Sequence, residues 1–305
     1  MFFMQVLIST LSQGLIWTIL TLGVFITFRI LNFADMTAEG SLTFGGSLCA
    51  ALMLRGVNPF LSLLIAGVLA SLAGLITGIL NTKFKIQAIL AGILTMIALY
   101  SLNLRIMGKA NLSLLGKSTI FSSLNNILPA LNSNFVLKTF IIGLVICIIS
   151  VVSLNLFFKT QIGLAVRATG DNEQMMRALG GNTDFKKILA LMISSFFCGL
   201  AGALIAQSQG YADVNMGTGS IVIALASIVI GEAFLNFIKF KNKILSSLIC
   251  MILGSIMYRI IIFIVLNLGM NPSDLKLFTA CITAVLLGMP KLKKFKLKLG
   301  GNKNA

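Results

Sequence analysis

Four ionisable side chains lie inside segments that are otherwise apolar enough to cross a membrane. Asp35 and Glu39 are four residues apart, about one helical turn, and Glu232 and Arg259 lie in two later apolar runs. A charged group inside a membrane is costly and usually faces a cavity or a partner. These residue types and this spacing therefore predict contact with a polar solute, or the carrying of protons, along a pathway through the membrane.

Structural roles remain open for the same side chains. Asp35 follows Arg29 closely, so its carboxylate is also placed to cap a helix at the cytoplasmic surface. Glu232 and Arg259 are expected to pair with each other, or Arg259 with Asp35 or Glu39. Pairing for stability is the commoner explanation for such charges, and contact with a substrate is the alternative.

Residues for covalent or metal chemistry are missing from the sequence. The chain contains no histidine, so neither a Ser/His/Asp nor a Cys/His arrangement can be built from it. LGKST at 115–119 ends like a phosphate-binding loop, but that pattern needs glycine at position 111, where the chain has Asn111. We expect no catalytic residue, metal site, cofactor or nucleotide site. Small packing residues are the expected role of the five cysteines, Cys49, Cys147, Cys198, Cys250 and Cys281.

One compact polar segment, GLAVRATGDNEQMMRALGG, occupies residues 163–181 between apolar runs. Gly170 is expected to break the preceding structure. Asp171 is expected to cap a new helix, with Gln174 three residues further on as in a capping box. The pair Gly180–Gly181 would then end that helix after about eight residues, or roughly 12 Å.

The apolar face of this helix indicates what it touches. Met175 and Leu179 share one face, with Met176 and Ala178 beside them. A short helix that presents methionine suits a groove on a soluble partner. The alternative is a helix that lies in the lipid interface. The residue pattern alone does not separate the two.

The elements that must position these residues are membrane-spanning helices. Of the 305 residues, 57% are hydrophobic and 10% are charged, and the mean hydropathy is +1.00. Soluble domains carry about 25% charged residues. Apolar runs of roughly 20 residues predict an all-α polytopic bundle of about 8–10 spans with at least one broken helix. The expected spans are 5–28, 30–54, 60–80, 86–104, 139–158, 188–207, 220–238, 244–266 and 274–290.

Charge predicts the orientation of these spans. The net charge is +16, from 24 Lys and Arg against 8 Asp and Glu, and we attribute it to cytoplasmic loops and not to nucleic-acid binding. One transmembrane domain at 1–290 is expected, with the N-terminus outside if 30–54 is one full span. Basic clusters separated by even numbers of spans are expected in the cytoplasm: Lys83, the 159–187 loop, Lys241 and the C-terminal tail at 291–305.

Small residues predict where helices break or pack closely. Gly40, Gly45 and Gly46 favour a broken helix near the first carboxylates. GTGS at 217–220 resembles the start of a second half-helix. In the span at 60–80, small residues recur at every fourth position and form a flat stripe. Packing inside the protomer is the commoner use of such a stripe, and a dimer seam is the alternative.

The polar segment and the span after it resemble the cytoplasmic coupling loop of ABC-transporter permeases, specifically those of the branched-chain amino acid and simple-sugar or nucleoside import families. The similar stretch is TQIGLAVRATGDNEQMMRALGGNTDFKKILALMISSFFCGLAGAL. The family pattern G-L-x-x-R-A-x-G-x-N-x-x-x-A-x-x-x-G is matched by Gly163, Leu164, Arg167, Ala168, Gly170, Asn172 and Gly180. The resemblance implies ATPase-coupling roles for Gly163, Arg167, Gly170, Asp171, Asn172, Met175, Ala178, Leu179 and Gly180.

A second resemblance lies in ILNFADMTAEGSLTFGGSLCAA at 30–51. The branched-chain family carries an N-F-A-H-G run here, in which Asn32, Phe33 and Ala34 match, whereas Asp35 and Met36 replace His-Gly. The run D-M-T-A-E-G-S instead resembles a permease branch with members assigned to aromatic amino acids. The candidate substrate-pathway residues are Asn32, Phe33, Asp35, Glu39, Glu232 and Arg259.

The resemblance implies a permease subunit, not an enzyme, of a bacterial ABC importer in the cytoplasmic membrane. The expected cargo is a small hydrophilic solute, with an amino acid first and a sugar or nucleoside next. The implied partners are ATPase subunits that bind the ATP, an extracytoplasmic solute-binding protein, a second permease copy and membrane lipid. An ion-coupled secondary transporter is the alternative, but it would leave the capped helix unexplained. A membrane-embedded enzyme comes third.

Overall fold

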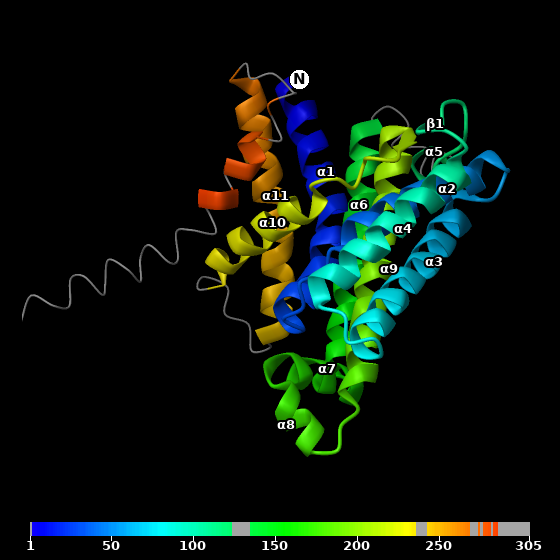
Figure 1. Ribbon diagram of the computed structural model, residues 1–305. Coiled ribbons are helices and arrows are strands. Elements are labelled where there is room, and N and C mark those ends of the chain that lie inside the picture. The colour runs from blue at the N-terminus through cyan, green and yellow to red at the C-terminus, as the bar shows by residue number, and fades with distance from the viewer. Residues whose placement is uncertain are drawn as a thin grey trace, which may run out of the picture.

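The computed structural model describes residues 2–123, 135–235 and 243–268, together with residues 274, 277–281 and 283–285. These parts form a bundle of helices with one small two-stranded sheet (Figure 1), which confirms the all-α fold class. The predicted last span at 274–290 is described only in part. Lys241 and the C-terminal tail at 291–305 lie outside the described residues, so their predicted side of the membrane stays a prediction.

A broken helix stands at the start of the chain, as predicted. Helix α1 (Phe2–Phe25) continues into the π-helical turn η1 (Ile26–Ile30), and α2 (Thr37–Leu54) begins only after an irregular segment. Asn32 adopts a left-handed backbone conformation with φ of 52° inside this break. Asparagine tolerates that conformation better than most residues, so the break follows from Asn32 and not from the downstream glycines.

The glycines of α2 have a different use from the one predicted. Gly45 and Gly46 lie within the continuous α2 helix, which packs closely on α9 (Thr183–Gln209). A Cβ atom added at Gly45 would overlap the backbone of Gly199 in α9. The prediction that these residues break the helix is wrong, because they are needed for close approach of two backbones.

The small-residue stripe of α3 (Pro59–Thr82) also faces α9. A Cβ atom added at Gly74 would overlap the carbonyl group of Leu191, and one added at Gly78 would lie 2.9 Å from Cα of Ile188. Asn58 caps this helix by accepting a hydrogen bond from the backbone N–H of Phe60 at 2.9 Å. The stripe therefore packs inside the protomer, which was the commoner of the two uses expected.

The remaining elements complete the bundle in chain order. They are α4 (Ala88–Met107), β1 (Asn111–Ser113), α5 (Ile120–Ser123), α6 (Phe135–Lys159), α7 (Gln161–Asp171), α8 (Glu173–Ala178), β2 (Tyr211–Asp213), α10 (Ser220–Phe234) and α11 (Lys243–Asn267). Strands β1 and β2 are antiparallel, with Leu112 opposite Ala212. Figure 1 shows the sheet and α5 at one end of the bundle and α7 and α8 at the other.

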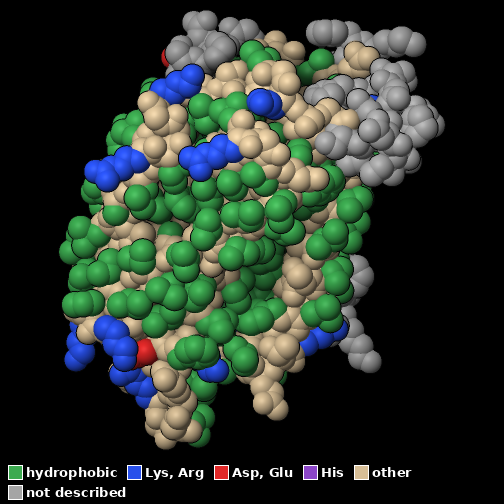
Figure 2. All heavy atoms as spheres, turned by 90° about the vertical axis from the view of Figure 1, so that its right-hand side faces the viewer, with side chains coloured by type: hydrophobic (Ala, Val, Ile, Leu, Met, Phe, Trp, Pro, Cys, Tyr) green, Lys and Arg blue, Asp and Glu red, His purple; other side chains and the backbone are tan. Residues whose placement is uncertain are grey.

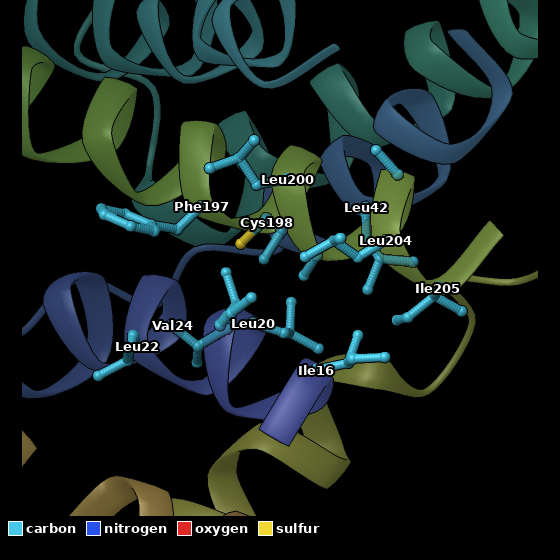
Figure 3. Packing of buried hydrophobic residues seen from close by; sticks show 14 of the residues in the cluster. Ile16, Leu20, Leu22, Val24, Leu42, Phe197, Cys198, Leu200, Leu204 and Ile205 are labelled. Atoms are coloured by element: carbon cyan, nitrogen blue, oxygen red, sulfur yellow. The ribbon is translucent and has the colours of Figure 1, made fainter. Parts of the chain in front are cut away.

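The core lies where α1, α2 and α9 meet. Figure 3 shows Leu20 of α1, Leu42 of α2 and Leu204 of α9 among the side chains that fill it. All three are fully buried. Cys198 lies in the same cluster, as expected for a small packing residue. The continuous helix α9 therefore connects this core to the α7–α8 end of the bundle.

Exposed apolar side chains form a band on the surface of the bundle. Figure 2 shows it on the face of α3 and α4, between two rows of Lys and Arg side chains. Exposed leucines such as Leu64 and Leu72 of α3 and Leu94 of α4 contribute to it. Large exposed apolar bands of this kind indicate contact with lipid.

Six helices among the described residues are long and apolar enough to cross a membrane, while α2 and α10 are shorter: Gln5–Ile30, Pro59–Thr82, Ala88–Met107, Val136–Lys159, Thr183–Gln209 and Lys243–Asn267. Helix α1 starts at the end of the bundle opposite α7 and α8 (Figure 1). That arrangement agrees with an N-terminus and a 159–187 loop on opposite sides of the membrane.

Candidate functional site

The polar segment at 163–181 folds as two short helices and not as one. Helix α7 continues through Gly170 to Asp171, so Gly170 does not break the preceding structure. The cap of α8 is Asn172, whose side chain accepts a hydrogen bond from the backbone N–H of Met175 at 3.0 Å. The prediction that Asp171 caps this helix is therefore wrong by one residue. The helix is also shorter than expected, with six residues.

An ion-pair cluster fixes α8 to the start of α9. Glu173 accepts from Arg177 at 3.0 Å and from Lys187 at 2.6 Å, and Arg177 also pairs with Asp184 at 2.9 Å. Burial raises the pKa of the Glu173 carboxyl, but the hydrogen bond and charge of Lys187, together with Arg177, outweigh it and lower that pKa. The two basic residues thus keep Glu173 ionised, and the ion pairs link α8 to the start of α9.

The predicted contact face of α8 is open. The side chain of Met175 is 48% exposed and that of Leu179 is 74% exposed, whereas Met176 is half-buried. Figure 1 shows α8 at the tip of the molecule, further from the apolar band than α7. Large apolar side chains at a polar tip fit docking on a soluble partner better than contact with lipid.

Helix α7 is packed directly on the break in the first span. The backbone of Gly170 lies against the backbone of Ile30, and an added Cβ atom would collide with the Ile30 carbonyl oxygen. The side chain of Asn32 donates a hydrogen bond to the carbonyl oxygen of Gly170 at 3.0 Å. Two of the predicted pathway and coupling residues, Asn32 and Gly170, are thus in contact with each other.

The structure also places two other predicted coupling residues, Gly163 and Arg167. The Thr160 side chain caps α7 by accepting a hydrogen bond from the backbone N–H of Gly163 at 3.2 Å. A Cβ atom at Gly163 would overlap the carbonyl group of Phe157, so glycine is required where α6 turns into α7. Arg167 lines a small pocket between α7, η1 and α11 and does not lie on the face of Met175.

Asp35 is buried in the break and not exposed at a surface. Its side chain is fully buried, and Oδ1 accepts a hydrogen bond from the backbone N–H of Thr37 at 2.8 Å. Oδ2 has no hydrogen-bond partner among the described residues. Asp35 therefore bonds to the first residue of α2, although the N-cap position itself is Met36. The contact lies inside the protein, where an unpaired carboxylate oxygen is costly. Phe33, in the same break, is buried in the core.

A hydroxyl chain ties the break to two further helices. Thr37 of α2, Thr77 of α3 and Thr95 of α4 are joined by hydroxyl contacts of 2.7 and 2.9 Å. Sequence reasoning missed these three residues, because single threonines in apolar runs carry no signal of their partners. They fix the start of α2 beside Asp35.

Glu39, in the first turn of α2, lines a cavity of about 230 Å³. The cavity also contains Tyr100 and Asn103 of α4 and Thr218 before α10. Glu39 Oε1 accepts a hydrogen bond from the backbone N–H of Gly219 at 2.9 Å. Polar groups converging on an otherwise apolar cavity are typical of a solute site. Gly219 starts α10, as predicted for the half-helix at 217–220.

The pairing predicted for Glu232 and Arg259 is wrong. Glu232 pairs with Arg29 of η1 at 2.5 Å, which anchors α10 to the broken helix. Arg259 lies over the ring of Trp17 in α1, 4.2 Å from its centroid, and pairs with neither Asp35 nor Glu39. Arg29 and Trp17 were not selected from the sequence, since their partners lie more than 200 positions away in the chain.

The sequence matches a family model described as the permease component of the branched-chain amino acid transport system, over residues 6–289. It is 40% identical over 300 residues to a tyrosine transport system permease protein of Clostridioides difficile (strain R20291), covering 97% of this chain and 96% of that protein. It is 23% identical over 244 residues to a ribose import permease protein of Haemophilus influenzae, covering 80% of this chain and 73% of that protein.

A solved structure is similar in fold. PsaBC from Streptococcus pneumoniae in complex with a Fab aligns with a TM-score of 0.51 and 17% sequence identity, covering 95% of this chain and 94% of that chain. At that level of identity the likeness concerns the arrangement of helices alone.

Proposed function

This chain belongs to the permease family of branched-chain amino acid transport systems, and we propose that it is the membrane-spanning subunit of an ATP-driven importer. The observation that carries this proposal is the α7–α8 loop, with Met175 and Leu179 exposed at the tip of the molecule. An ATPase partner covers this face and binds the ATP, while the permease contributes no chemistry. The loop, and with it the C-terminus, is on the cytoplasmic side of a bacterial inner membrane.

An amino acid is the proposed cargo, and an aromatic amino acid in particular. The relative with 40% identity is named as a tyrosine transport permease, and the similarity spans nearly the whole of both chains. A sugar is the second candidate, because a ribose import permease is also similar, though at 23% identity. An extracytoplasmic binding protein delivers the solute to the end that carries β1 and β2, and a second copy of the chain completes the membrane unit.

The contacts around α7 provide a route from the ATPase to the membrane. A displacement of α8 moves the start of α9 through the ion pairs of Glu173 and Arg177. The same displacement moves α7, which presses on the break through Gly170 and Asn32. The break carries Asp35 and leads directly into α2 and Glu39. Closure of the ATPases therefore shifts the population of outward-open and inward-open states through two rigid connections.

The experiment that tests this proposal is co-purification of the ATPase with Met175→Asp in detergent. Burial of a whole methionine side chain is worth about 1.5–3 kcal/mol, and nearly half of Met175 is still exposed for a partner to cover. The new carboxylate must also be desolvated. We expect the ATPase to bind about tenfold more weakly or worse.

The matched control is Leu115→Asp, the same kind of change on an 87% exposed leucine at the opposite end of the bundle. It is expected to leave ATPase binding unchanged. Retention of the ATPase by Met175→Asp, with normal solute-stimulated hydrolysis, would show that α8 lies in the lipid interface and would remove the main support for the importer.

A further inference from the structure

Arg259 is a half-buried cation that forms no ion pair among the described residues. It lies in α11 inside the apolar run from Lys243 to Asn267. Its Nε atom is buried and has no hydrogen-bond partner among the described residues. The guanidinium plane rests on Trp17 of α1. Stacking on an aromatic ring stabilises a cation, but it leaves the N–H donors of the guanidinium unused.

No acidic side chain of the chain neutralises Arg259. The sequence contains eight Asp and Glu residues, and all eight lie in the described parts of the chain. Glu232 is paired with Arg29, Glu39 with the backbone N–H of Gly219, and Asp35 with that of Thr37. Within those parts, the ion pairs involve Arg29, Arg177 and Lys187 and never Arg259. A charge kept in a membrane at this cost is expected to serve a function.

The guanidinium borders a cavity that is large enough for a small solute. The cavity measures about 410 Å³ and lies between α1, α10, α11 and the segment at 277–281. Trp17 forms one side, and Thr218, Gly219 and Thr279 provide polar groups beside Arg259. Ligand pockets are commonly about 300–1,000 Å³, mostly apolar, with a few polar groups that fix orientation.

We propose that this cavity is a transient substrate site in which Arg259 binds the carboxylate of the transported solute. The planar guanidinium matches a carboxylate in a two-point contact, and that pairing is strong where water is excluded. The stacked Trp17 holds the guanidinium in place and offers apolar surface to the rest of the solute. This assignment rests on the proposed amino-acid cargo and extends it to a specific contact.

The Arg259 cavity and the Glu39 cavity lie on either side of the turn before α10. Gly219 lines the Arg259 cavity and donates its backbone N–H to Glu39, and Thr218 lines both cavities. The 218–219 turn therefore separates two cavities, one bordered by a carboxylate and one by a guanidinium. A solute that passes from one to the other exchanges a site suited to its ammonium group for one suited to its carboxylate.

Trp17 makes the proposal testable, because it is the chain's one tryptophan. The purified full-length permease in phosphatidylcholine nanodiscs is titrated with L-tyrosine while tryptophan fluorescence is recorded with selective excitation. Tyramine, which lacks the carboxylate, is the matched ligand. We expect a saturable change with L-tyrosine and none with tyramine at the same concentrations.

The variants separate the guanidinium from overall folding. Arg259→Gln is expected to weaken the L-tyrosine response about thirtyfold or more, which is the lower end for loss of one partner from a buried charge pair. Arg259→Lys keeps the charge without the two-point contact and is expected to lie between Arg259→Gln and the wild type. Arg105→Gln, the same change at an exposed arginine of α4, is the control. Unchanged ATPase association shows that each variant is folded.

Three results would overturn the inference. Equal responses to L-tyrosine and tyramine, or an Arg259→Gln response equal to that of Arg105→Gln, would show that Arg259 binds no carboxylate while the importer itself stands. A wild-type response to D-ribose, with none to L-tyrosine, would instead refute the amino-acid cargo and remove the basis for this site.

Discussion

The contact between Gly170 and the break predicts that one methyl group will uncouple ATP hydrolysis from transport. A Cβ atom at position 170 would lie 1.9 Å from the carbonyl oxygen of Ile30. Real Cβ contacts are not shorter than 3.0 Å, so Gly170→Ala forces α7 and η1 apart by about 1.1 Å, the difference of these two values. The obstacle is backbone, and no rotamer change relieves the overlap.

The energetic effect on folding is expected to be moderate. Alanine in place of glycine inside a helix gains about 0.5–1 kcal/mol. Overpacking typically costs about 1–3 kcal/mol, so the net loss of stability is about 0–2.5 kcal/mol. The main consequence is geometric, because the hydrogen bond from Asn32 to the Gly170 carbonyl crosses the same contact.

The assay is solute uptake per ATP hydrolysed in proteoliposomes that contain the permease and its ATPase. We expect Gly170→Ala to retain the ATPase, since Met175 and Leu179 are untouched, but to transport severalfold less solute per ATP. The matched control is Gly143→Ala in α6, where the nearest heavy atom to an added Cβ is at an ordinary 3.5 Å. If both variants couple equally well, then α7 does not act on the break, and the proposed route through Asn32 is wrong.

Other predictions concern the helix cap, the carboxylates and the orientation of the loop. Asn172→Ala should destabilise α8 by about 0.5–2 kcal/mol and weaken ATPase binding, whereas Asp171→Ala should not; equal effects would contradict the cap. Asp35→Asn or Glu39→Gln should lower uptake at normal protein level, and intact uptake in both would leave these carboxylates with structural roles only. The folded-state pKa of Glu173 is lowered, so the stability from its ion pairs is present above its ordinary value of 4.5 and is lost as pH falls through the lowered pKa. The fluorescence anisotropy of a dye attached to Leu179→Cys should therefore stay constant from neutral pH down to about 4.5 and decrease below it. Glu173→Gln should abolish this decrease in anisotropy. A cysteine at position 172, in a chain without native cysteines, should resist an impermeant reagent in intact cells, and labelling there would reverse the predicted topology.

Local patterns determined the class of the protein and its two candidate functional regions. Hydropathy and the low fraction of charged residues predicted the helical bundle, because every backbone group in lipid must be bonded within its own helix. The spacing of Met175 and Leu179 predicted an exposed apolar face, and the structure confirms its exposure. The predicted end of this helix at Gly180 is confirmed as well, because Gly180 has a left-handed backbone φ of 79°. Each of these properties depends on a few consecutive residues.

The tertiary structure decided the contacts of Glu232 and Arg259 and the roles of Gly45 and Gly170. Glu232 reaches Arg29 and Arg259 reaches Trp17, in both cases across a large part of the chain. Gly45 and Gly170 looked like helix breakers, yet both lie inside helices where another backbone passes at close range. A glycine in a sequence does not indicate whether it provides a flexible backbone or space for a neighbouring backbone. Only packing distinguishes the two, because the neighbour belongs to a distant segment.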